Sequence, residues 1–289
     1  MKIKILIPIY NDWQSVFKLL ENINSEVSNL GHEFSVIIVN DASTESKPEL
    51  TTNLDNLNSI KIINMRENRG HARCNATGLK HIFENEEFDY VIPMDGDGED
   101  RPEEIKQLVD NLNYHPDKPI VGERIKRSEG IFFKLCYFIH KLITYTFTGQ
   151  SIKFGNYSCL PKSIVERMIN EKATWSSFSG ALAKVSKDRA TIPSERGSRY
   201  FGPSKMSFKN LTIHSLAIIS VFKFNVLLRS IMFLIVYMFL IHQNISIIML
   251  IPFPLIILLV VLVFFTSKRE SLEEMKDSFS NILNIDNIK

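Results

Sequence analysis

The chain has 289 residues and a nearly balanced formal charge of +2, with 34 Lys and Arg against 32 Asp and Glu. This length fits one large domain or two small ones, and the charge balance argues against nucleic acid as the main partner. The cysteines, Cys74, Cys136 and Cys159, are far apart and form no C-x-x-C pair. They therefore predict buried, reduced thiols and neither a disulfide framework nor a zinc site.

The first two hundred residues have the pattern of a soluble α/β domain. Short apolar runs, continuous and bounded by polar turns, indicate strands that are buried on both faces of a sheet. These runs cover 3–9, 34–40, 60–64, 90–94 and 119–123. Segments with the length and spacing of helices lie between them at 13–29, 71–86 and 102–113. This alternation predicts a Rossmann-like, mostly parallel sheet with helices on its faces.

The segment 131–148 is strongly apolar but carries Lys134, His140 and Lys141. These charges favour an amphipathic helix that packs on the domain or lies in a bilayer interface. Farther along, 244–266 has no charged residue and is long enough to cross a hydrocarbon core of about 30 Å.

A second span is expected at about 222–242, where Lys223 and Arg229 would have to reach one membrane surface with their long side chains. Lys and Arg residues flank this hairpin on both sides, whereas its turn "HQN" has none. The positive-inside rule then predicts a multi-pass protein of the inner (cytoplasmic) membrane with both ends and the soluble domain in the cytoplasm. The expected parts are an α/β domain at 1–205, a juxtamembrane amphipathic helix at 206–221, a transmembrane hairpin at 222–266 and a cytoplasmic tail at 267–289.

Polar motifs stand where three of the predicted strands end: "PIYND", "VNDAS" and "MDGDGED". In parallel sheets, ligands bind outside the carboxyl ends of the strands. The acidic motif is compatible with a solvated turn, because Asp and Gly are common turn formers, and with a divalent cation site. Asp95 and Asp97 can direct oxygens toward one hard ion, and Mg²⁺ commonly takes only one or two protein carboxylates.

Together with "ENRGHARCNATGL", these motifs form an ordered set over residues 3 to 124. The set resembles the family 2 glycosyltransferases, which have the GT-A nucleotide-sugar fold, and "DGDGED" stands where that family carries its Asp-x-Asp motif. The resemblance implies an enzyme that uses a nucleotide sugar and a Mg²⁺ or Mn²⁺ cofactor. The sequence does not identify the base of the nucleotide, for which we favour uracil over guanine.

The resemblance also implies roles for single positions. Residues expected to bind the donor are Pro8, Tyr10, Asn11, Asp12, Asp41, Asn68, Gly70 and Arg124. Asp95 and Asp97 are expected to hold the metal–diphosphate, with Glu99 as an additional ligand. For Gly70 and Gly78 two interpretations stay open, ligand contact or helix entry with close helix packing.

A second motif, "RYFGPSKMSF", is similar to the Arg-x-x-Gly-x-Ser-Lys segment of the polyprenyl-phosphate and dolichyl-phosphate sugar synthases. This likeness implies a polyprenyl phosphate acceptor, such as undecaprenyl phosphate, and a membrane partner. The expected acceptor-binding residues are Arg199, Ser204 and Lys205, with Lys134 as a further candidate. A basic loop that only contacts anionic lipid is the alternative.

The region 173–186 has no carboxylate, although many hydroxyl-directed relatives place a Glu-Asp pair there. A lipid phosphate is ionised near neutral pH and needs no general base. We therefore expect a single displacement that depends on Asp95, Asp97, Arg199 and Lys205, and the family resemblance implies that it inverts the anomeric configuration. Two other functions remain open: transfer to a hydroxyl of a lipid-linked or membrane-proximal glycan, and a non-catalytic nucleotide-sugar-binding scaffold. The sequence also leaves a homo-oligomer open.

Overall fold

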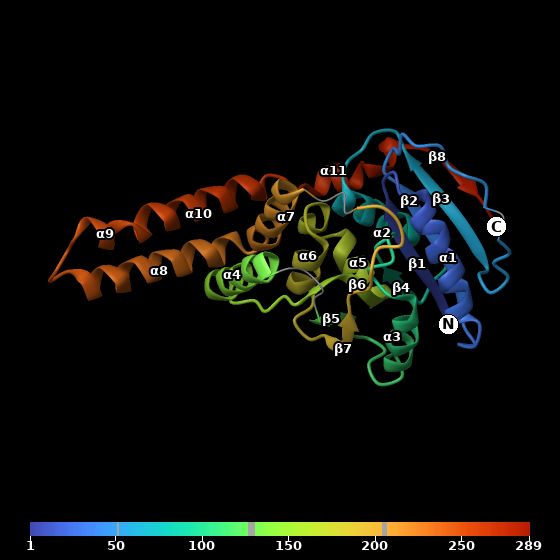
Figure 1. Ribbon diagram of the computed structural model, residues 1–289, viewed down its shortest axis with the longest axis horizontal. Coiled ribbons are helices and arrows are strands. Elements are labelled where there is room, and N and C mark those ends of the chain that lie inside the picture. Colours follow the sequence, from blue (N-terminus) through green and yellow to red (C-terminus); the bar gives the residue numbers. More distant parts are fainter. Residues whose placement is uncertain (51, 127–130, 204–206) are drawn as a thin grey trace. The chain divides into compact units, whose positions relative to one another are not determined.

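The computed structural model describes residues 1–50, 52–126, 131–203 and 207–289 (Figure 1). The chain forms two compact units, and each unit is made of segments that are separate in the sequence. An α/β unit consists of Met1–Ser128, Lys153–Lys205 and Ser271–Lys289. A helical unit consists of Glu129–Ile152 and Met206–Glu270.

The α/β unit contains one sheet of eight strands in the order β7-β5-β6-β4-β1-β2-β3-β8. Its strands are β1 Lys2–Ile9, β2 Glu33–Asn40, β3 Ser59–Met65, β4 Tyr90–Pro93, β5 Ile120–Lys126, β6 Phe154–Pro161, β7 Ala190–Glu195 and β8 Ile282–Asn287. The central strands β4, β1, β2 and β3 are parallel, whereas β6 and β8 are antiparallel to their neighbours. The five predicted strands and the mostly parallel centre are confirmed. Of three further strands, β6 lies between β4 and β5, and β7 and β8 form the two edges of the sheet.

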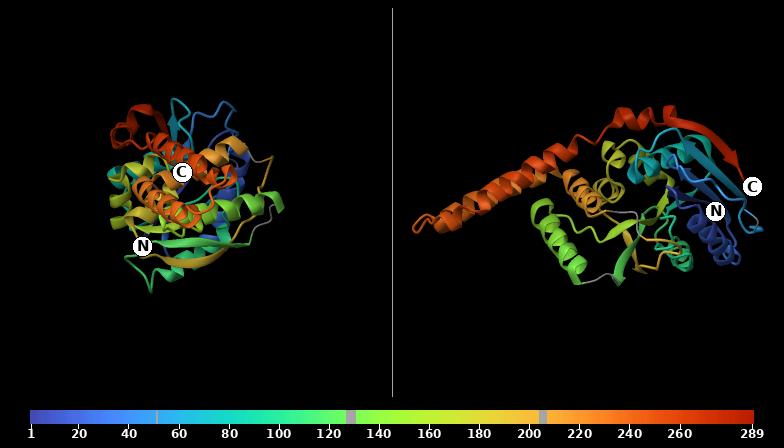
Figure 2. Two further views of the ribbon diagram at one scale, coloured as in Figure 1. Left: turned by 90° about the vertical axis from the view of Figure 1, so that its left-hand side faces the viewer. Right: turned by 45° about the horizontal axis from the view of Figure 1, so that its top comes forward.

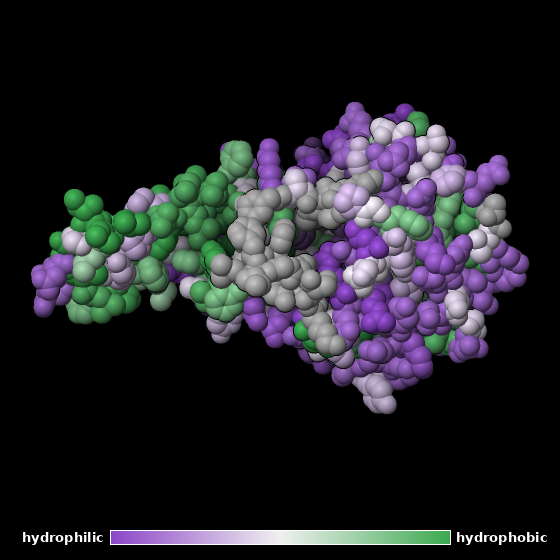
Figure 3. Space-filling view, in the orientation of Figure 1, coloured by the Kyte–Doolittle hydropathy of each residue, from purple (hydrophilic) through white to green (hydrophobic). Residues whose placement is uncertain are grey.

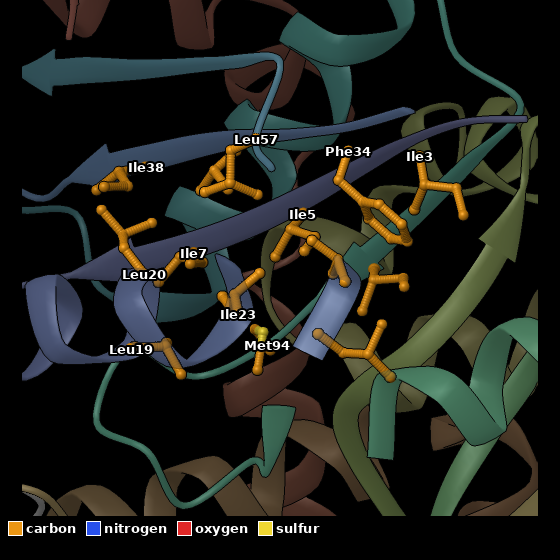
Figure 4. Close-up of a cluster of buried hydrophobic side chains, with 14 of the residues drawn as sticks. Ile3, Ile5, Ile7, Leu19, Leu20, Ile23, Phe34, Ile38, Leu57 and Met94 are labelled. Carbon is orange, nitrogen blue, oxygen red and sulfur yellow. The ribbon is translucent and has the colours of Figure 1, made fainter. Parts of the chain in front are cut away.

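Helices cover both faces of this sheet. They are α1 Trp13–Val27, α2 His71–Asn85, η1 Pro102–Glu104, α3 Ile105–Asn111, α5 Lys162–Ile169, η2 Lys172–Trp175, α6 Phe178–Val185, α11 Leu272–Lys276 and η3 Ser278–Asn281. Alternate residues of β1 and β2 meet Leu19, Leu20 and Ile23 of α1 in a continuous buried cluster (Figure 4). On the opposite face, Leu6 of β1 points toward α2 at Gly78. The apolar runs are buried on both sides, as their composition predicts.

Two of the three cysteines, Cys74 and Cys159, are buried free thiols, as the sequence indicates. Burial raises the pKa of both thiols, which makes them inert at neutral pH. The side chain of Cys136 lies outside the described residues.

The helical unit is built from α4 Ile131–Thr148, α7 Phe208–Ser220, α8 Lys223–Ile241, α9 Ile247–Leu250 and α10 Pro252–Ser267. Among the residues described, two helices are long and apolar enough to cross a membrane, and they lie where the hairpin was predicted. They run side by side (Figure 2), and their surface is mainly hydrophobic (Figure 3). Proline marks a boundary here, because α9 ends before Pro252 and α10 begins at it.

The two basic residues of α8 have partners inside the helical unit. Lys223 Nζ lies 3.1 Å from Ser267 Oγ, and Arg229 donates to the Thr146 carbonyl at 3.1 Å. Gly149, just after α4, has φ +74, and a Cβ on it would come within 2.6 Å of the Arg229 guanidinium. Arg229 therefore lies over the C-terminal end of α4, where the helix dipole favours a positive charge.

Residues after the hairpin return to the α/β unit. β8 pairs with the outer edge of β3, and Asn64 Nδ2 donates to Asn284 at 2.8 Å and to Asp286 at 2.9 Å. Met275 packs with Ala76 of α2 and Trp175 of η2. The segment predicted as a tail thus contributes a strand and a short helix to the sheet unit, and only the short helix was expected from the sequence.

Candidate active site

The loops that follow β1 and β2 are joined by Asn11. Its backbone N–H donates to Ser43 Oγ at 2.8 Å, and its side-chain oxygen accepts from the backbone N–H groups of Thr44 and Glu45 at 2.7 and 3.1 Å. Asn11 has a positive φ of 51°, which Asn tolerates better than most residues. Beside it, Tyr10 is 42% exposed. The motif after the first strand therefore holds the loops after β1 and β2 together and leaves the Tyr10 ring accessible to a ligand.

Asp41, at the end of β2, is buried and holds the start of α2. Its two carboxylate oxygens accept from the backbone N–H groups of Arg69 and Gly70 at 2.7 and 2.8 Å. Asn68 donates to the Asp41 carbonyl at 3.2 Å. Gly70 has φ +91, a conformation that L side chains rarely adopt. Three predicted donor residues, Asp41, Asn68 and Gly70, thus lie together in one hydrogen-bonded corner.

The acidic loop, residues 95–100, follows β4 and depends on glycine at two points. A Cβ at Gly96 would come within 2.8 Å of Ile9, so only glycine lets the loop pass beside the end of β1. Gly98 has φ +88, and a Cβ there would meet the Tyr200 ring at 2.5 Å. Asp97 Oδ1 accepts from the Glu99 N–H at 2.9 Å, which folds the loop back on itself. This geometry gathers the carboxylates at the carboxyl end of the parallel strands.

The carboxylates of the acidic loop disturb one another. Burial and the charge of Asp95 raise the pKa of Asp97 to about 6. The same two causes raise the pKa of Asp100, whose side chain accepts from the Asp95 N–H at 2.9 Å, to about 8. For Asp95, burial opposes ionisation, but His71, Arg124 and Asn156 outweigh it and lower the pKa. The neighbouring cationic side chains therefore do not fully compensate the negative charge of the loop.

Two residues outside the predicted site meet Asp95. Asn156 of β6 donates to Asp95 Oδ1 at 3.1 Å and lies 2.6 Å from His71 Nε2. His71, the first residue of α2, lies 3.3 Å from the same carboxylate oxygen. Asn156 was not predicted as a site residue, because its contact with Asp95 joins residues 61 positions apart. Arg124 was predicted near the donor phosphates, and its guanidinium lies 4.0 Å from Asp100.

A segment that we call the strap, residues 196–200, crosses the acidic loop. Its backbone N–H groups at Gly197 and Tyr200 donate to the carbonyls of Glu99 and Asp97 at 2.8 and 3.0 Å. Arg199 of the strap donates to Asp97 at 2.6 Å and to Asp12 at 2.5 Å. Arg199, which was predicted to bind the acceptor, thus bridges Asp97, predicted to bind the metal, and Asp12, predicted to bind the donor.

Arg196 of the strap pairs with Glu99, so two of the three residues predicted to hold the cation carry an arginine partner. Pro8 is buried within β1. Ser204 and Lys205 lie outside the described residues, as does the side chain of Lys134.

The residues present fit a divalent cation bound together with a phosphorylated ligand. Among the residues that the structure describes, no three His, Cys, Asp or Glu side chains form a ready-made cage. Mg²⁺ and similar ions do not need one, because they take one or two carboxylates and fill the other positions with water and phosphate. The raised pKa of Asp97, caused by burial and by Asp95, indicates a place where a cation would relieve repulsion.

This fold and site define a class: mixed α/β domains with a carboxylate-lined site, suited to a cation and a phosphorylated ligand, at the ends of parallel strands. Over residues 4–165 the chain matches the model of glycosyl transferase family 2, and it belongs to this family.

Curated relatives include undecaprenyl-phosphate 4-deoxy-4-formamido-L-arabinose transferases from Salmonella paratyphi B and Salmonella newport. Each is 30% identical over 220 residues, which cover 73% of this chain and 64% of the relative. The match thus spans just under two thirds of the length of these relatives.

Solved structures show the same fold. Glucosyl-3-phosphoglycerate synthase from Mycobacterium tuberculosis, in complex with Mn²⁺, UDP and phosphoglyceric acid, aligns with a TM-score of 0.57 and 12% identity over 78% of each chain. S. aureus TarS 1-349 in complex with UDP-GlcNAc aligns with a TM-score of 0.52 and 16% identity over 80% of this chain and 70% of that one.

Proposed function

We propose that the chain is a membrane-anchored inverting glycosyltransferase. It moves a sugar from a nucleotide sugar, with UDP as the favoured nucleotide, to a polyprenyl phosphate such as undecaprenyl phosphate, for a cell-envelope glycan. The observation that carries the proposal is the meeting of Asp12, Asp97 and Arg199 within one hydrogen-bonded group. The names of the curated relatives support the same acceptor.

On the donor side, the corner formed by Asp41, Asn68 and Gly70 and the exposed ring of Tyr10 receive the nucleoside. Asp95 and Asp97, with Glu99 beside them, would hold Mg²⁺ or Mn²⁺, which supplies positive charge against the diphosphate. Arg124 adds a fixed positive charge beside the acidic loop. The departing diphosphate is stabilised in this way while its bond to the sugar breaks.

On the acceptor side, Arg199, Ser204, Lys205 and Lys134 orient the lipid phosphate, whose oxygen attacks the anomeric carbon. This nucleophile is already ionised and needs no general base. The segment 173–186, which has no carboxylate, forms η2 and the largely buried α6. Asp188, a carboxylate that follows it, is 74% exposed at its side chain and pairs with Lys118 at the surface. Both observations favour a phosphate over a hydroxyl acceptor.

The position of the hairpin in the chain supports one shared side of the membrane for both flanking segments, and the basic residues around the hairpin favour the cytoplasmic side of the inner membrane. Residues on both sides of it, up to 205 and from 271, fold into the same α/β unit. An even number of crossings satisfies this connectivity, as two spanning helices would. The hairpin then anchors the site at the surface where a lipid phosphate is offered.

The test is an assay of membranes that contain the full chain. Radiolabelled UDP-sugars are supplied with undecaprenyl phosphate, and the lipid is then extracted. We expect a labelled lipid that mild acid hydrolyses, because a sugar phosphodiester is acid-labile. Asp97→Asn should abolish the product, whereas Asp110→Asn, which removes an exposed carboxylate paired with Lys106, should not.

Three results would contradict the proposal in different ways. An acid-stable product would indicate a hydroxyl acceptor. Binding of a UDP-sugar without any product would indicate a scaffold. Full turnover by Asp97→Asn, with an unchanged circular dichroism spectrum, would remove the acidic loop from the chemistry.

A further inference from the structure

Arg199 occupies the carboxylates that the donor needs. Its guanidinium lies 2.5 Å from Asp12 and 2.6 Å from Asp97, and its side chain is only 15% exposed. Asp97 Oδ1 is already used by the Glu99 N–H, so the arginine holds the other oxygen. A divalent cation on Asp97 would therefore share its ligand with a guanidinium, and the two positive charges would repel each other at short range.

Asp12 is engaged in the same way. It precedes α1 at the N-cap position, where an Asp side chain commonly accepts from the first turn of its own helix. Here Asp12 makes no such cap bond within the described chain, and its carboxylate turns to Arg199 instead. The arginine thus bridges the loop after β1 and the acidic loop after β4.

The present position does not satisfy Arg199 completely. Its Nε is buried and has no hydrogen-bond partner among the described residues. A buried donor without a partner costs free energy, so an arrangement that offers it an acceptor competes with the present one. A phosphate monoester is such an acceptor, since guanidinium groups bind phosphate through parallel hydrogen bonds.

The strap itself is held independently of Arg199. The backbone hydrogen bonds from Gly197 and Tyr200 fasten it to the acidic loop. The Tyr200 ring lies against Gly98, and its hydroxyl accepts from Asn22 at 2.8 Å. A change at Arg199 can therefore be a rotation of one side chain, with the strap backbone remaining in place.

We infer that Arg199 is the resident counter-ion of the donor site. It holds Asp12 and Asp97 while no donor is bound, leaves them when a cation-bearing nucleotide sugar enters, and is thereby released to bind the acceptor phosphate. The inference rests on the proposed function and adds an order to it: the donor binds first and creates the acceptor site. By linkage, pairing of Arg199 with these carboxylates weakens the binding of the divalent cation in the free protein, and binding of the cation weakens the pairing.

The test measures Mn²⁺ binding to the purified full chain in nanodiscs by the loss of the free Mn²⁺ signal in electron paramagnetic resonance. We expect R199Q to bind Mn²⁺ roughly 5- to 150-fold more tightly than the unmodified protein without nucleotide, the range usual for coupled sites. R199K retains the charge and should stay close to the unmodified protein. K106Q removes a charge from an exposed pair and should leave Mn²⁺ affinity unchanged.

A second measurement follows the acceptor. Binding of geranyl phosphate, a short prenyl phosphate, should be strengthened by Mn²⁺ and UDP in the unmodified protein, and R199Q should lose this enhancement. Circular dichroism confirms that the variant is folded.

Equal or weaker Mn²⁺ binding by R199Q, in protein that still binds UDP, would overturn the inference and leave the proposed function in place. Absence of both Mn²⁺ and UDP binding from every variant and from the unmodified protein would overturn both.

Discussion

Asp100 shows how the acidic loop affects stability at the level of one residue. It is 5% exposed, its neighbours include Asp95 and Asp97, and the nearest guanidinium, that of Arg124, is 4.0 Å away. Burial and Asp95 raise its pKa from 3.8 to about 8, so the folded protein keeps a proton here at neutral pH while the unfolded chain does not. The contribution of Asp100 to the free energy of unfolding should therefore fall as the pH rises from about 4 to about 8.

Asp100→Asn tests this sign directly. The asparagine oxygen can still accept from the Asp95 N–H, but it has no charge to bury. We expect the melting temperature of the variant, relative to the unmodified protein, to be about 5 °C higher at pH 8 than at pH 5. Thermal denaturation of the metal-free protein at both pH values measures the difference. A variant whose relative melting temperature is the same at both would show that Asp100 is ionised in the folded state.

Single residues of the site were predictable to the extent that they lie in local motifs. Asp95, Asp97 and Asp41 follow buried strands, and this pattern by itself predicts that they meet at one edge of the sheet. The contact of Asn156 with Asp95, and that of Arg199 with Asp12, join residues 61 and 187 positions apart. No periodicity in the sequence reports such pairs, because they depend on how β6 and the strap pass the acidic loop.

At the level of elements, the close packing of α2 on β1 depends on glycine at position 78. A Cβ on Gly78 would lie 2.3 Å from Leu6 Cδ1 and 3.1 Å from Val39 Cγ2. The structure thus gives Gly78 the close-packing role that the sequence left open beside ligand contact. Since α2 begins at His71, next to the Asp41 corner, its distance from the sheet also sets the donor site.

Gly78→Ala should destabilise the protein by about 1–3 kcal/mol, the usual cost of overpacking. The free energy of unfolding by urea measures the loss. Leu6→Val removes the methyl groups that the new Cβ would meet, so the double variant should recover part of the loss that Gly78→Ala causes alone. If the two effects simply add, the Leu6 contact is not the cause, because residues in contact show non-additive effects.

The strands differ in how clearly the sequence shows them. β1 to β5 are apolar runs in a parallel arrangement, and all were predicted within a few residues. β8 reads "ILNIDN", a short and mixed pattern after a membrane hairpin, and its partner β3 lies about 220 positions earlier. Its pairing depends on an uncovered sheet edge elsewhere in the fold, which local sequence cannot report.

The whole molecule consists of a sheet unit whose chain is interrupted by a helical unit. The helical unit interrupts it twice, with Glu129–Ile152 and with Met206–Glu270, and the segments on either side of the hairpin, Lys153–Lys205 and Ser271–Lys289, belong to the sheet unit. If the hairpin crosses a membrane, segments before and after it must lie on the same side. The basic residues around the hairpin predicted the same result from charge alone.

Cysteine labelling in intact cells checks this topology. In a background without the native cysteines, Glu26→Cys and Glu273→Cys should resist a membrane-impermeant maleimide and react fully after permeabilisation, since both side chains are exposed. Gln243→Cys, in the turn of the hairpin, should react in intact cells. Different protection of positions 26 and 273 would contradict the shared side, and protection of position 243 would contradict a full crossing.

The pairing of β8 with β3 has a consequence for biosynthesis. Ribosomes make the chain from its N-terminus, so β3 is synthesised long before β8. The main-chain groups at the outer edge of β3 stay unpaired until the hairpin and then β8 have been synthesised. If the hairpin enters a membrane, completion of the sheet therefore follows that insertion in time. A nascent chain that stalls before residue 282 would expose the unpaired edge of β3, which can associate with other chains. We expect such a chain to be bound by chaperones or degraded by proteases.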